Sequence, residues 1–544
     1  MENAGRRDFL KSLGPAAAAL SSAAKAGGQA PPPGNQPGKR PNVLFLMADQ
    51  FRADAISALG NREIYTPNID RLVKAGVTFT NTYSQCPVCV AARYGIRTGC
   101  EPTRTRVFSN AISKPLPGQE ASMQARCGAY LAETMRSLGY RTFGVGKFHT
   151  SPWDEKLGFD VHLHSEELYA TPDQRNRDSF ASWIRTEQPA YNFIEGLMGE
   201  RTEMYYMPQM SPMPAEATVE RWAADRAIEQ MQAQSGSPGD KPWFGFVSFI
   251  GPHPPFAPPI PFNRLYDPDR MHNPVRGDLA HDHADEQIPW MNYAIWAEDI
   301  NDSHARVLRA RYYGEITYID DCIGRILKTL ETRGELQNTV VVFFSDHGDM
   351  LGDHHGWQKE TYFESSAHVP FIVNWPGRTK PATTCDQLVA LTDLFGLATQ
   401  AAGKPDYRMG TDIMGGLEGT AKRRDLLFGY YGEPGTPLFK IMARSGGWKY
   451  IYFANGGREQ LFDLKTDSNE MTNLAERNRS MKNELRVSAI RACNNPEGRL
   501  ALDGSDLRAF PFHARPLRRI YQFDRSRGVT KFPASPRDIL SDWS

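Results

Sequence analysis

Three nearly continuous apolar runs, each followed by polar residues, place the strongest constraint on the fold of this chain. The runs cover residues 41–48, 243–250 and 338–344. Apolar runs without polar alternation are typical of strands buried on both faces, as in a parallel sheet covered by helices. The polar residues that follow the runs include Asp49, Gln50, His253, Asp346 and His347. Because open α/β sheets bind ligands beyond the carboxyl ends of their strands, the pattern predicts a site built from distant parts of the sequence.

Helical and strand-like segments alternate up to about residue 420. Helical spacing occurs at residues 66–74, 127–138, 215–234 and 306–336. Short apolar runs indicate further strands at residues 141–145 and 369–375. This alternation predicts an α/β fold with a mostly parallel sheet between helices.

The pattern of apolar and turn-forming residues changes beyond residue 420. Four short strand-like runs, separated by Gly, Pro and Asn, cover residues 426–431, 439–443, 449–453 and 459–464. A helical segment follows at residues 485–493. These features predict a smaller C-terminal α+β subdomain in which one helix covers an antiparallel sheet.

The composition describes a globular protein and argues against several classes of function. With 544 residues, the chain is long enough for two or more hydrophobic cores. Lys+Arg and Asp+Glu are both 63, so the charge balance indicates no nucleic-acid partner and any cationic site must be local. Seven cysteines do not form a disulfide framework. Cys86 and Cys89 have the spacing of a redox or zinc pair, but we find no second pair at zinc-ligand spacing.

The N-terminus has the pattern of an export signal. Arg6 and Arg7 precede a weakly apolar stretch at residues 13–24, and Ala24-Lys25-Ala26 fits a cleavage site. We interpret residues 1–26 as a twin-arginine signal peptide and residues 27–40 as a linker. This predicts export by the twin-arginine (Tat) translocase to the periplasm or outside the cell, with no integral membrane segment in the mature chain.

Cys89 begins the most specific motif in the chain. It is followed by Ala91, Arg93 and then Thr98-Gly99. This stretch resembles the Cys-x-Pro/Ala-x-Arg signature of the type I, formylglycine-dependent sulfatases, which belong to the alkaline-phosphatase-like superfamily. The resemblance implies that Cys89 is oxidised to formylglycine (3-oxoalanine) by a formylglycine-generating or anaerobic sulfatase-maturating enzyme. One hydroxyl of the hydrated aldehyde would attack sulfur, and loss of a proton from the other would release sulfate.

The same resemblance implies a divalent metal site. Its ligands would be Asp49, Gln50, Cys89, Asp346 and His347. Hard oxygen ligands favour Ca²⁺. Gln50 stands where many sulfatases have a second Asp, and His347 adds a nitrogen, which leaves Mn²⁺, Mg²⁺ and Zn²⁺ as alternatives.

Further matches to the family concern the reacting groups. The residues with an implied catalytic role are Cys89, Arg93, Lys147, His149, His253 and Lys359. Arg93, Lys147 and Lys359 would bind the sulfate oxygens, where fixed cations match the charge that grows during transfer. His149 lies in Gly-Lys-Phe-His, which is similar to the family's Gly-Lys-x-His, and would act as the base that triggers sulfate release. His253 lies in Gly-Pro-His-Pro-Pro and would protonate the departing alkoxide.

The resemblance covers roughly residues 41–480 and divides the chain. It implies a catalytic domain at residues 41–420 and the antiparallel-sheet subdomain at residues 421–500. Residues 501–544 are rich in Arg, Pro and aromatic residues. We interpret them as an arm that packs on the body of the protein or on a second copy in a homo-oligomer.

The leading hypothesis is an exported sulfatase that hydrolyses an O-sulfate ester to an alcohol and sulfate. The substrate would be a sulfated small molecule or a glycan. The first alternative is a phosphonate monoester or phosphodiester hydrolase on the same scaffold, and choline-sulfatase-like enzymes also carry Asp-Gln after the first strand. A non-catalytic binding protein would require Cys89 to remain a thiol, and a cysteine hydrolase would leave the metal and lysine positions unexplained.

Two long loops would select the substrate. They cover residues 153–215 and 255–300, and their aromatic side chains would either stack on sugar rings or pack internally. Those residues include Tyr191, Phe193, Tyr205, Tyr206, Trp290 and Tyr293.

Overall fold

The computed structural model describes residues 40–166, 172–192, 205–233 and 241–519. These described residues belong to one compact unit. The predicted export signal and most of the linker lie outside the described residues, as do residues 520–544 of the arm. Within the described part of the chain, no helix combines the length and apolarity needed to cross a bilayer.

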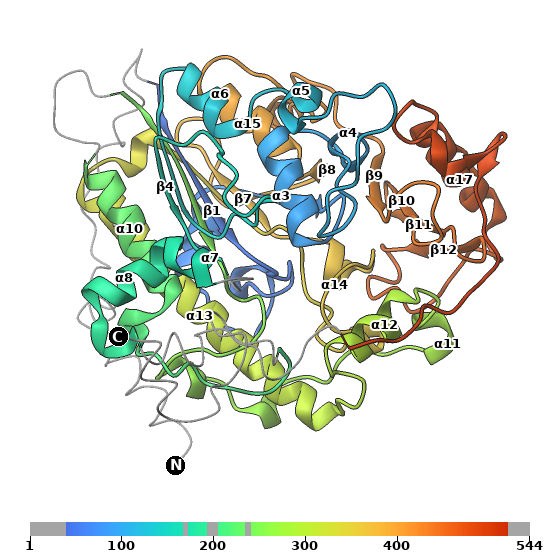
Figure 1. Ribbon diagram of the computed structural model, residues 1–544, viewed down its shortest axis with the longest axis horizontal. Coiled ribbons are helices and arrows are strands. Elements are labelled where there is room, and N and C mark those ends of the chain that lie inside the picture. Colours follow the sequence, from blue (N-terminus) through green and yellow to red (C-terminus); the bar gives the residue numbers. More distant parts are fainter. Residues whose placement is uncertain (1–39, 167–171, 193–204, 234–240, 520–544) are drawn as a thin grey trace. The chain divides into compact units, whose positions relative to one another are not determined.

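An eight-stranded sheet forms the centre of this unit (Figure 1). Its strand order is β4-β3-β5-β1-β6-β7-β2-β8. The strands are β1 (Asn42–Ala48), β2 (Val77–Tyr83), β3 (Arg141–Gly146), β4 (Val161–His164), β5 (Trp243–Phe249), β6 (Thr339–Phe344), β7 (Phe371–Asn374) and β8 (Thr383–Ala390). Only β7 runs antiparallel to its two neighbours, so the predicted mostly parallel sheet is confirmed.

Strand β1 lies in the middle of the sheet and feeds two cores. Phe45 and Met47 join the core that contains residues of α3 (Cys89–Thr98), α6 (Leu131–Ser137) and α15 (Asp393–Ala401). Leu44 and Leu46 join the opposite core, with residues of α10 (Val219–Ala233) and α13 (Asp302–Thr332). Each such side chain contributes about 2 kcal/mol by leaving water. Burial on both faces explains why the strand has no polar alternation.

A second sheet follows in the chain and is antiparallel throughout. Its order is β12-β11-β10-β9. The strands are β9 (Leu427–Tyr431), β10 (Lys440–Ser445), β11 (Trp448–Phe453) and β12 (Arg458–Asp463). Leu485 and Ala489 of α17 (Arg479–Cys493) pack with Ile441 and Tyr450 of this sheet. The predicted C-terminal antiparallel sheet with a covering helix is therefore confirmed.

The described part of the C-terminal arm packs on the body of the same chain. Phe510 forms a β-bridge with Asn455. The Arg515 guanidinium lies 3.2 Å from the centre of the Trp290 ring. The arm also contains the short strands β13 (Leu502–Asp503) and β14 (Asp506–Leu507).

The remaining α-helices include α2 (Pro67–Ala75), which matches the helix predicted at residues 66–74. The others are α4 (Pro102–Thr105), α5 (Met123–Cys127), α7 (Pro172–Arg177), α8 (Ser179–Glu187), α11 (Leu279–Asp282), α12 (Gln287–Ala294), α14 (Glu364–Ala367) and α16 (Ile413–Glu418). The helix predicted at residues 127–138 is wrong at its start, because Gly128 with φ 83° separates α5 from α6. Strands β2, β4 and β8 had not been predicted.

Candidate active site

Four neighbouring strands deliver their following residues to one edge of the sheet. Strands β3, β5, β1 and β6 are adjacent and parallel. Lys147 follows β3, His253 lies in the loop after β5, Asp49 follows β1, and Asp346 lies just after β6. Parallel strands end at the same edge, so residues up to about 300 positions apart in the chain meet there.

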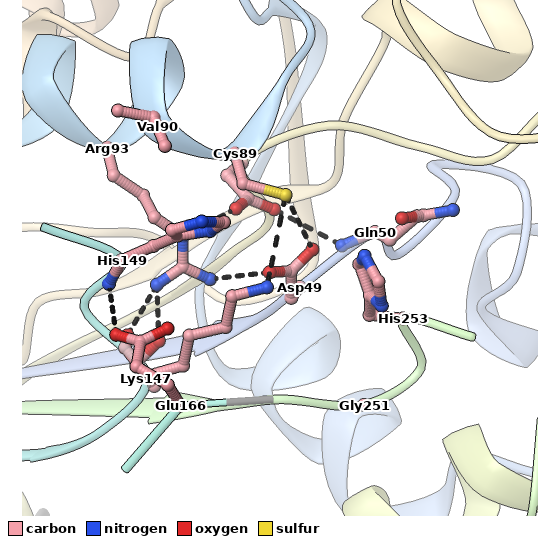
Figure 2. A network of polar contacts seen from close by, with 12 residues as sticks. Asp49, Gln50, Cys89, Val90, Arg93, Lys147, His149, Glu166, Gly251 and His253 are labelled. Carbon is pink, nitrogen blue, oxygen red and sulfur yellow. Dashed lines mark hydrogen bonds and ion pairs between the residues drawn. The ribbon is translucent and has the colours of Figure 1, made fainter. Parts of the chain in front are cut away.

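Helix α3 begins at Cys89 and is buried along its whole length. The side chain of Val88 does not cap its first turn, but the N–H of Val90 donates to Oδ1 of Asn110 at 3.1 Å. The positive end of the helix dipole lies beside Cys89. The sulfur of Cys89 lies 3.1 Å from Nζ of Lys359 and 3.2 Å from Nε2 of His347. It lies 3.7 Å from Oδ1 of Asp49 (Figure 2). Cys89 thus stands between cationic groups and carboxylates.

Arg93 joins the two carboxylates of the site. Its Nε donates to Oδ2 of Asp346 at 2.9 Å, and its second amino group donates to Oδ2 of Asp49 at 2.8 Å. Lys147 adds an ion pair with the same Asp49 oxygen at 2.6 Å. Burial works to raise the pKa of Asp49, but the charges of Lys147 and Arg93 outweigh it and hold that pKa well below its ordinary value. The Asp49 carboxylate is therefore ionised at neutral pH.

The donor groups of this cluster fit a divalent metal ion. One ligand atom from each of Asp49, Cys89, Asp346 and His347 lies within 4.8 Å of the others, and all four residues are buried. Nδ1 of His347 lies 3.0 Å from the carbonyl oxygen of Gly348, so Nε2 is the ring nitrogen that faces the cluster. Two buried carboxylates and one imidazole form a donor set that suits a divalent cation.

Gln50 connects the cluster to residues that the sequence analysis did not assign. Its backbone N–H donates to Oδ1 of Asp346 at 3.2 Å, and its side-chain oxygen accepts from Nζ of Lys359 at 2.7 Å. Its amide nitrogen donates to Asp349 and, at 3.2 Å, to Gln358. Asp349 stands three positions after Asp346, so a signal for it was visible in the polar cluster that follows β6.

His149 and His253 complete the predicted set. His149 adopts a left-handed backbone with φ 49°, which a non-glycine residue adopts only where its surroundings impose it. His253 is buried, and its charge acts on Asp49. Figure 2 shows His149 on the side of Arg93 and His253 on the side of Asp49 and Gln50. The structure thus brings every predicted site residue to one place.

Neither His354 nor His355, which follow the Asp346-His347 pair closely in the sequence, shows a contact with Cys89 among the described interactions. His354 binds Asp282 through Nδ1 at 2.7 Å and stacks on Phe363. His355 faces the carbonyl oxygen of Gly277 at 3.2 Å. Both therefore serve a separate polar cluster around α11.

The aromatic residues of the two long loops mainly pack internally. The Tyr206 hydroxyl donates to Oδ2 of Asp349 at 2.6 Å, and Tyr205 lies edge-on to His253. Trp290 is covered by Arg515, and the guanidinium of Arg519 lies over Tyr293. Phe193 lies outside the described residues. The structure supports internal packing as the role of these described side chains, and does not support an exposed surface on which sugar rings stack.

Gly146→Ala is expected to damage the site more than a glycine substitution elsewhere. A Cβ at Gly146, which has φ 100°, would lie 2.0 Å from the backbone oxygen of Ser248 in β5. Relief of this clash requires β3 to shift at the point where Lys147 follows. We expect about 3 kcal/mol of destabilisation and a roughly 100-fold loss of activity, measured by denaturation and ester hydrolysis.

The matched control is Gly60→Ala. Gly60 has φ 112°, and an added Cβ would have nothing within 4 Å. It should cost only about 1 kcal/mol from the left-handed backbone and leave activity unchanged. Equal losses in both variants would show that the contact with Ser248 does not position Lys147.

Comparison with known proteins identifies relatives over most of the chain. A family model described as Sulfatase matches residues 41–404, and one described as N-sulphoglucosamine sulphohydrolase, C-terminal, matches residues 352–490. An arylsulfatase of Clostridium perfringens is 29% identical over 457 residues, which cover 80% of this chain and 90% of the relative. A choline-sulfatase of Rhizobium meliloti is 29% identical over 469 residues, which cover 83% of this chain and 86% of the relative.

A solved structure is also similar to this chain over most of its length. The phosphonate monoester hydrolase of Agrobacterium radiobacter superposes with a TM-score of 0.69 and 26% identity. The match covers 83% of this chain and 96% of that enzyme.

Proposed function

The chain belongs to the sulfatase family of the alkaline-phosphatase-like superfamily and is a sulfuric ester hydrolase, and we propose that Cys89, oxidised to formylglycine, is its nucleophile. One observation carries this proposal. The Cys89 sulfur lies at the start of a buried helix, with Nζ of Lys359 at 3.1 Å and Nζ of Lys147 at 3.9 Å. An anion that reaches Cys89 therefore meets two fixed cations there.

The family implies a divalent metal and formylglycine, and the donor set described above fits the metal. We propose Asp49, Gln50, Cys89, Asp346 and His347 as the ligands of one Ca²⁺ ion, because most of the donors are hard oxygens. Mn²⁺, Mg²⁺ and Zn²⁺ are the alternatives. The bound metal would supply Lewis acidity beside the nucleophile.

The residues around Cys89 would divide the chemistry between binding and proton transfer. Arg93, Lys147 and Lys359 would hold the sulfate oxygens through charge-assisted hydrogen bonds. Arg93 is well suited to a fixed role, because its salt bridges to both carboxylates lock the guanidinium plane.

The two histidines would act on opposite sides of the reaction. His253 would donate a proton to the alcohol oxygen as the ester bond breaks. His149 would accept a proton from the formylglycine hydroxyl in the step that releases sulfate. His253 must carry the proton that it donates, and His149 must be neutral before it accepts one. Histidine can supply both states because it ordinarily titrates near neutral pH.

We propose a sulfated sugar or a small organic sulfate as the substrate. One of the matching family models is described by a sulfated glucosamine, and one relative is a choline-sulfatase. These names support both substrate classes and do not distinguish between them.

A phosphonate monoester or phosphodiester hydrolase is the second candidate. The superposition on the Agrobacterium radiobacter enzyme favours it, because that match extends over 96% of the solved chain. Parallel assays of aryl sulfate, aryl phosphonate and aryl phosphodiester substrates, each with several divalent metals, separate the candidates. We expect the highest kcat/KM on the sulfate; a phosphonate rate far above the sulfate rate would replace this assignment.

Processing and domain limits are further proposals. The Arg6-Arg7 motif and the alanine-rich stretch after it support export through the Tat translocase to the periplasm or beyond, after Cys89 has been oxidised by a sulfatase-maturating enzyme. Fractionation of native cells checks the location.

We propose a catalytic domain at residues 41–420, the antiparallel-sheet subdomain at residues 421–500 and the arm at residues 501–544.

A further inference from the structure

Glu166 is a buried carboxylate that the sequence analysis did not assign to the site. It follows β4 and is 4% exposed. Its Oε1 accepts from the backbone N–H of His149 at 2.6 Å and from that of Phe148 at 3.3 Å. Figure 2 shows Glu166 beneath the turn that carries Lys147 and His149. One carboxylate oxygen thus binds two successive amides of the Gly-Lys-Phe-His turn.

Glu166 is itself held from several directions. His164 places Nε2 at 2.7 Å from the same Oε1. The backbone N–H of Glu166 donates to Oδ2 of Asp178 at 3.0 Å, and Asp178 also caps α8 by accepting from the N–H of Ala181. The N–H of Ser165 donates to the carbonyl oxygen of Gly146 at 3.0 Å. The carboxylate is therefore fixed between the end of β4 and the end of β3.

The carboxylate is charged at neutral pH. Burial alone would raise the pKa of Glu166, but the hydrogen bond and charge of His164 and the charges of His149 and Lys147 outweigh burial and lower the pKa to about 2. His149 consequently lies beside a permanent negative charge.

We propose that Glu166 is a positioning residue of the reaction, which holds the left-handed His149 backbone by accepting hydrogen bonds from the N–H groups of Phe148 and His149, and which sets the charge beside the His149 imidazole. His164 is its outer partner, which orients the carboxylate. The inference rests on the proposed function, because it assumes that His149 accepts a proton during sulfate release. Glu166 touches no reacting atom and acts only through His149.

The charged groups around His149 determine the sign of the expected effect. Lys147 lies two positions before it, Arg93 lies on α3 within electrostatic range of Glu166, and Glu166 and His164 lie at the end of β4. Glu166 is the negative member of this group nearest to the His149 backbone. Its removal therefore favours neutral His149, and activity that needs the neutral base should persist to lower pH.

Glu166→Gln is the principal test, because glutamine keeps the size and an acceptor oxygen but loses the charge. The pH dependence of kcat/KM would be measured on whichever ester the wild-type enzyme hydrolyses fastest. We expect about a tenfold loss at the optimum and a shift of the acid limb by about one pH unit to lower pH. Glu166→Asp keeps the charge but is too short to reach both amides, so its rate should fall without a shift of the acid limb.

Glu155→Gln is the matched control. Glu155 lies in the same part of the chain and accepts from the hydroxyls of Tyr94, at 2.5 Å, and Tyr130, but has no described contact with the His149 amide. The acid limb of the kcat/KM profile of Glu155→Gln should lie at the same pH as in the wild type.

Histidine NMR gives a second measurement that does not depend on turnover. In protein labelled with ¹⁵N-histidine, the His149 signal is identified by its loss in His149→Gln, and its titration is compared between the wild type and Glu166→Gln. A lower titration midpoint in Glu166→Gln supports the inference, even if the wild type hydrolyses a different ester from the one proposed. An unchanged midpoint together with an unshifted acid limb would overturn it.

Discussion

Cys89→Ala is expected to reduce ester hydrolysis by roughly 10⁴-fold or more, because removal of a covalent nucleophile leaves only binding and electrostatic contributions. The Cys89 sulfur occupies the point where Lys359, His347 and Asp49 converge. No other described cysteine occurs in that cluster. The measurement is single-turnover and steady-state hydrolysis of the preferred ester by the metal-loaded protein.

Cys86→Ala is the matched control for this substitution. Cys86 is also buried and stands three positions before Cys89. Burial, followed by the charge of Glu360, raises the pKa of Cys86 well above its ordinary value, so its thiol is neutral and unreactive. Activity within about threefold of the wild type is expected, since neutral truncations away from the reacting groups seldom change transition-state binding. If Cys89→Ala kept the activity of Cys86→Ala, the proposed nucleophile would be wrong.

Arg93→Ala should produce the largest loss of stability among the site variants. The Arg93 side chain is 3% exposed and its partners Asp49 and Asp346 are 0% exposed. Its removal leaves two buried carboxylates with less compensating charge, and breaking a buried pair in this way costs about 3–5 kcal/mol. Urea unfolding in the presence of a chelator would measure this loss.

Added Ca²⁺ should restore part of the stability of Arg93→Ala, since a divalent cation places positive charge between the same carboxylates. The control is Arg378→Ala, which breaks an ion pair with Glu418 whose side chains are 25% and 32% exposed. That pair should contribute less than about 1 kcal/mol. A loss at Arg93 no larger than the loss at Arg378 would contradict the view that Arg93 neutralises the cluster.

Much of the fold, and the part of the site that lies at strand ends, could be predicted from the apolar runs, whereas Cys89, Arg93 and Lys359 were assigned from the resemblance to the sulfatases. The apolar runs correspond to β1, β5 and β6, and their burial on both faces leaves a clear signal in the sequence. The polar residues after them are a few positions from a recognisable strand. Adjacent parallel strands then bring Asp49 and Asp346 together without any further information.

The unpredicted parts depend on tertiary contacts. Strand β2 is an exception, because Val77–Tyr83 is rich in the β-branched and aromatic residues that are typical of strands, and the sequence analysis assigned no strand there. Strand β4 has only four residues. Glu166, which follows this strand, reaches the site because the N–H of Ser165 donates to the carbonyl oxygen of Gly146 at the end of β3. The position of Glu166 under His149 follows from the pairing of β3 with β4, which no local pattern encodes.

The oxidation state of Cys89 in protein from the native host tests the central claim most directly. Mass spectrometry of the tryptic peptide at residues 75–93, with and without a hydrazide reagent, measures it. We predict a peptide lighter than the thiol form that reacts with the hydrazide, as an aldehyde does. An intact Cys89 thiol in active, natively produced protein would contradict a formylglycine nucleophile.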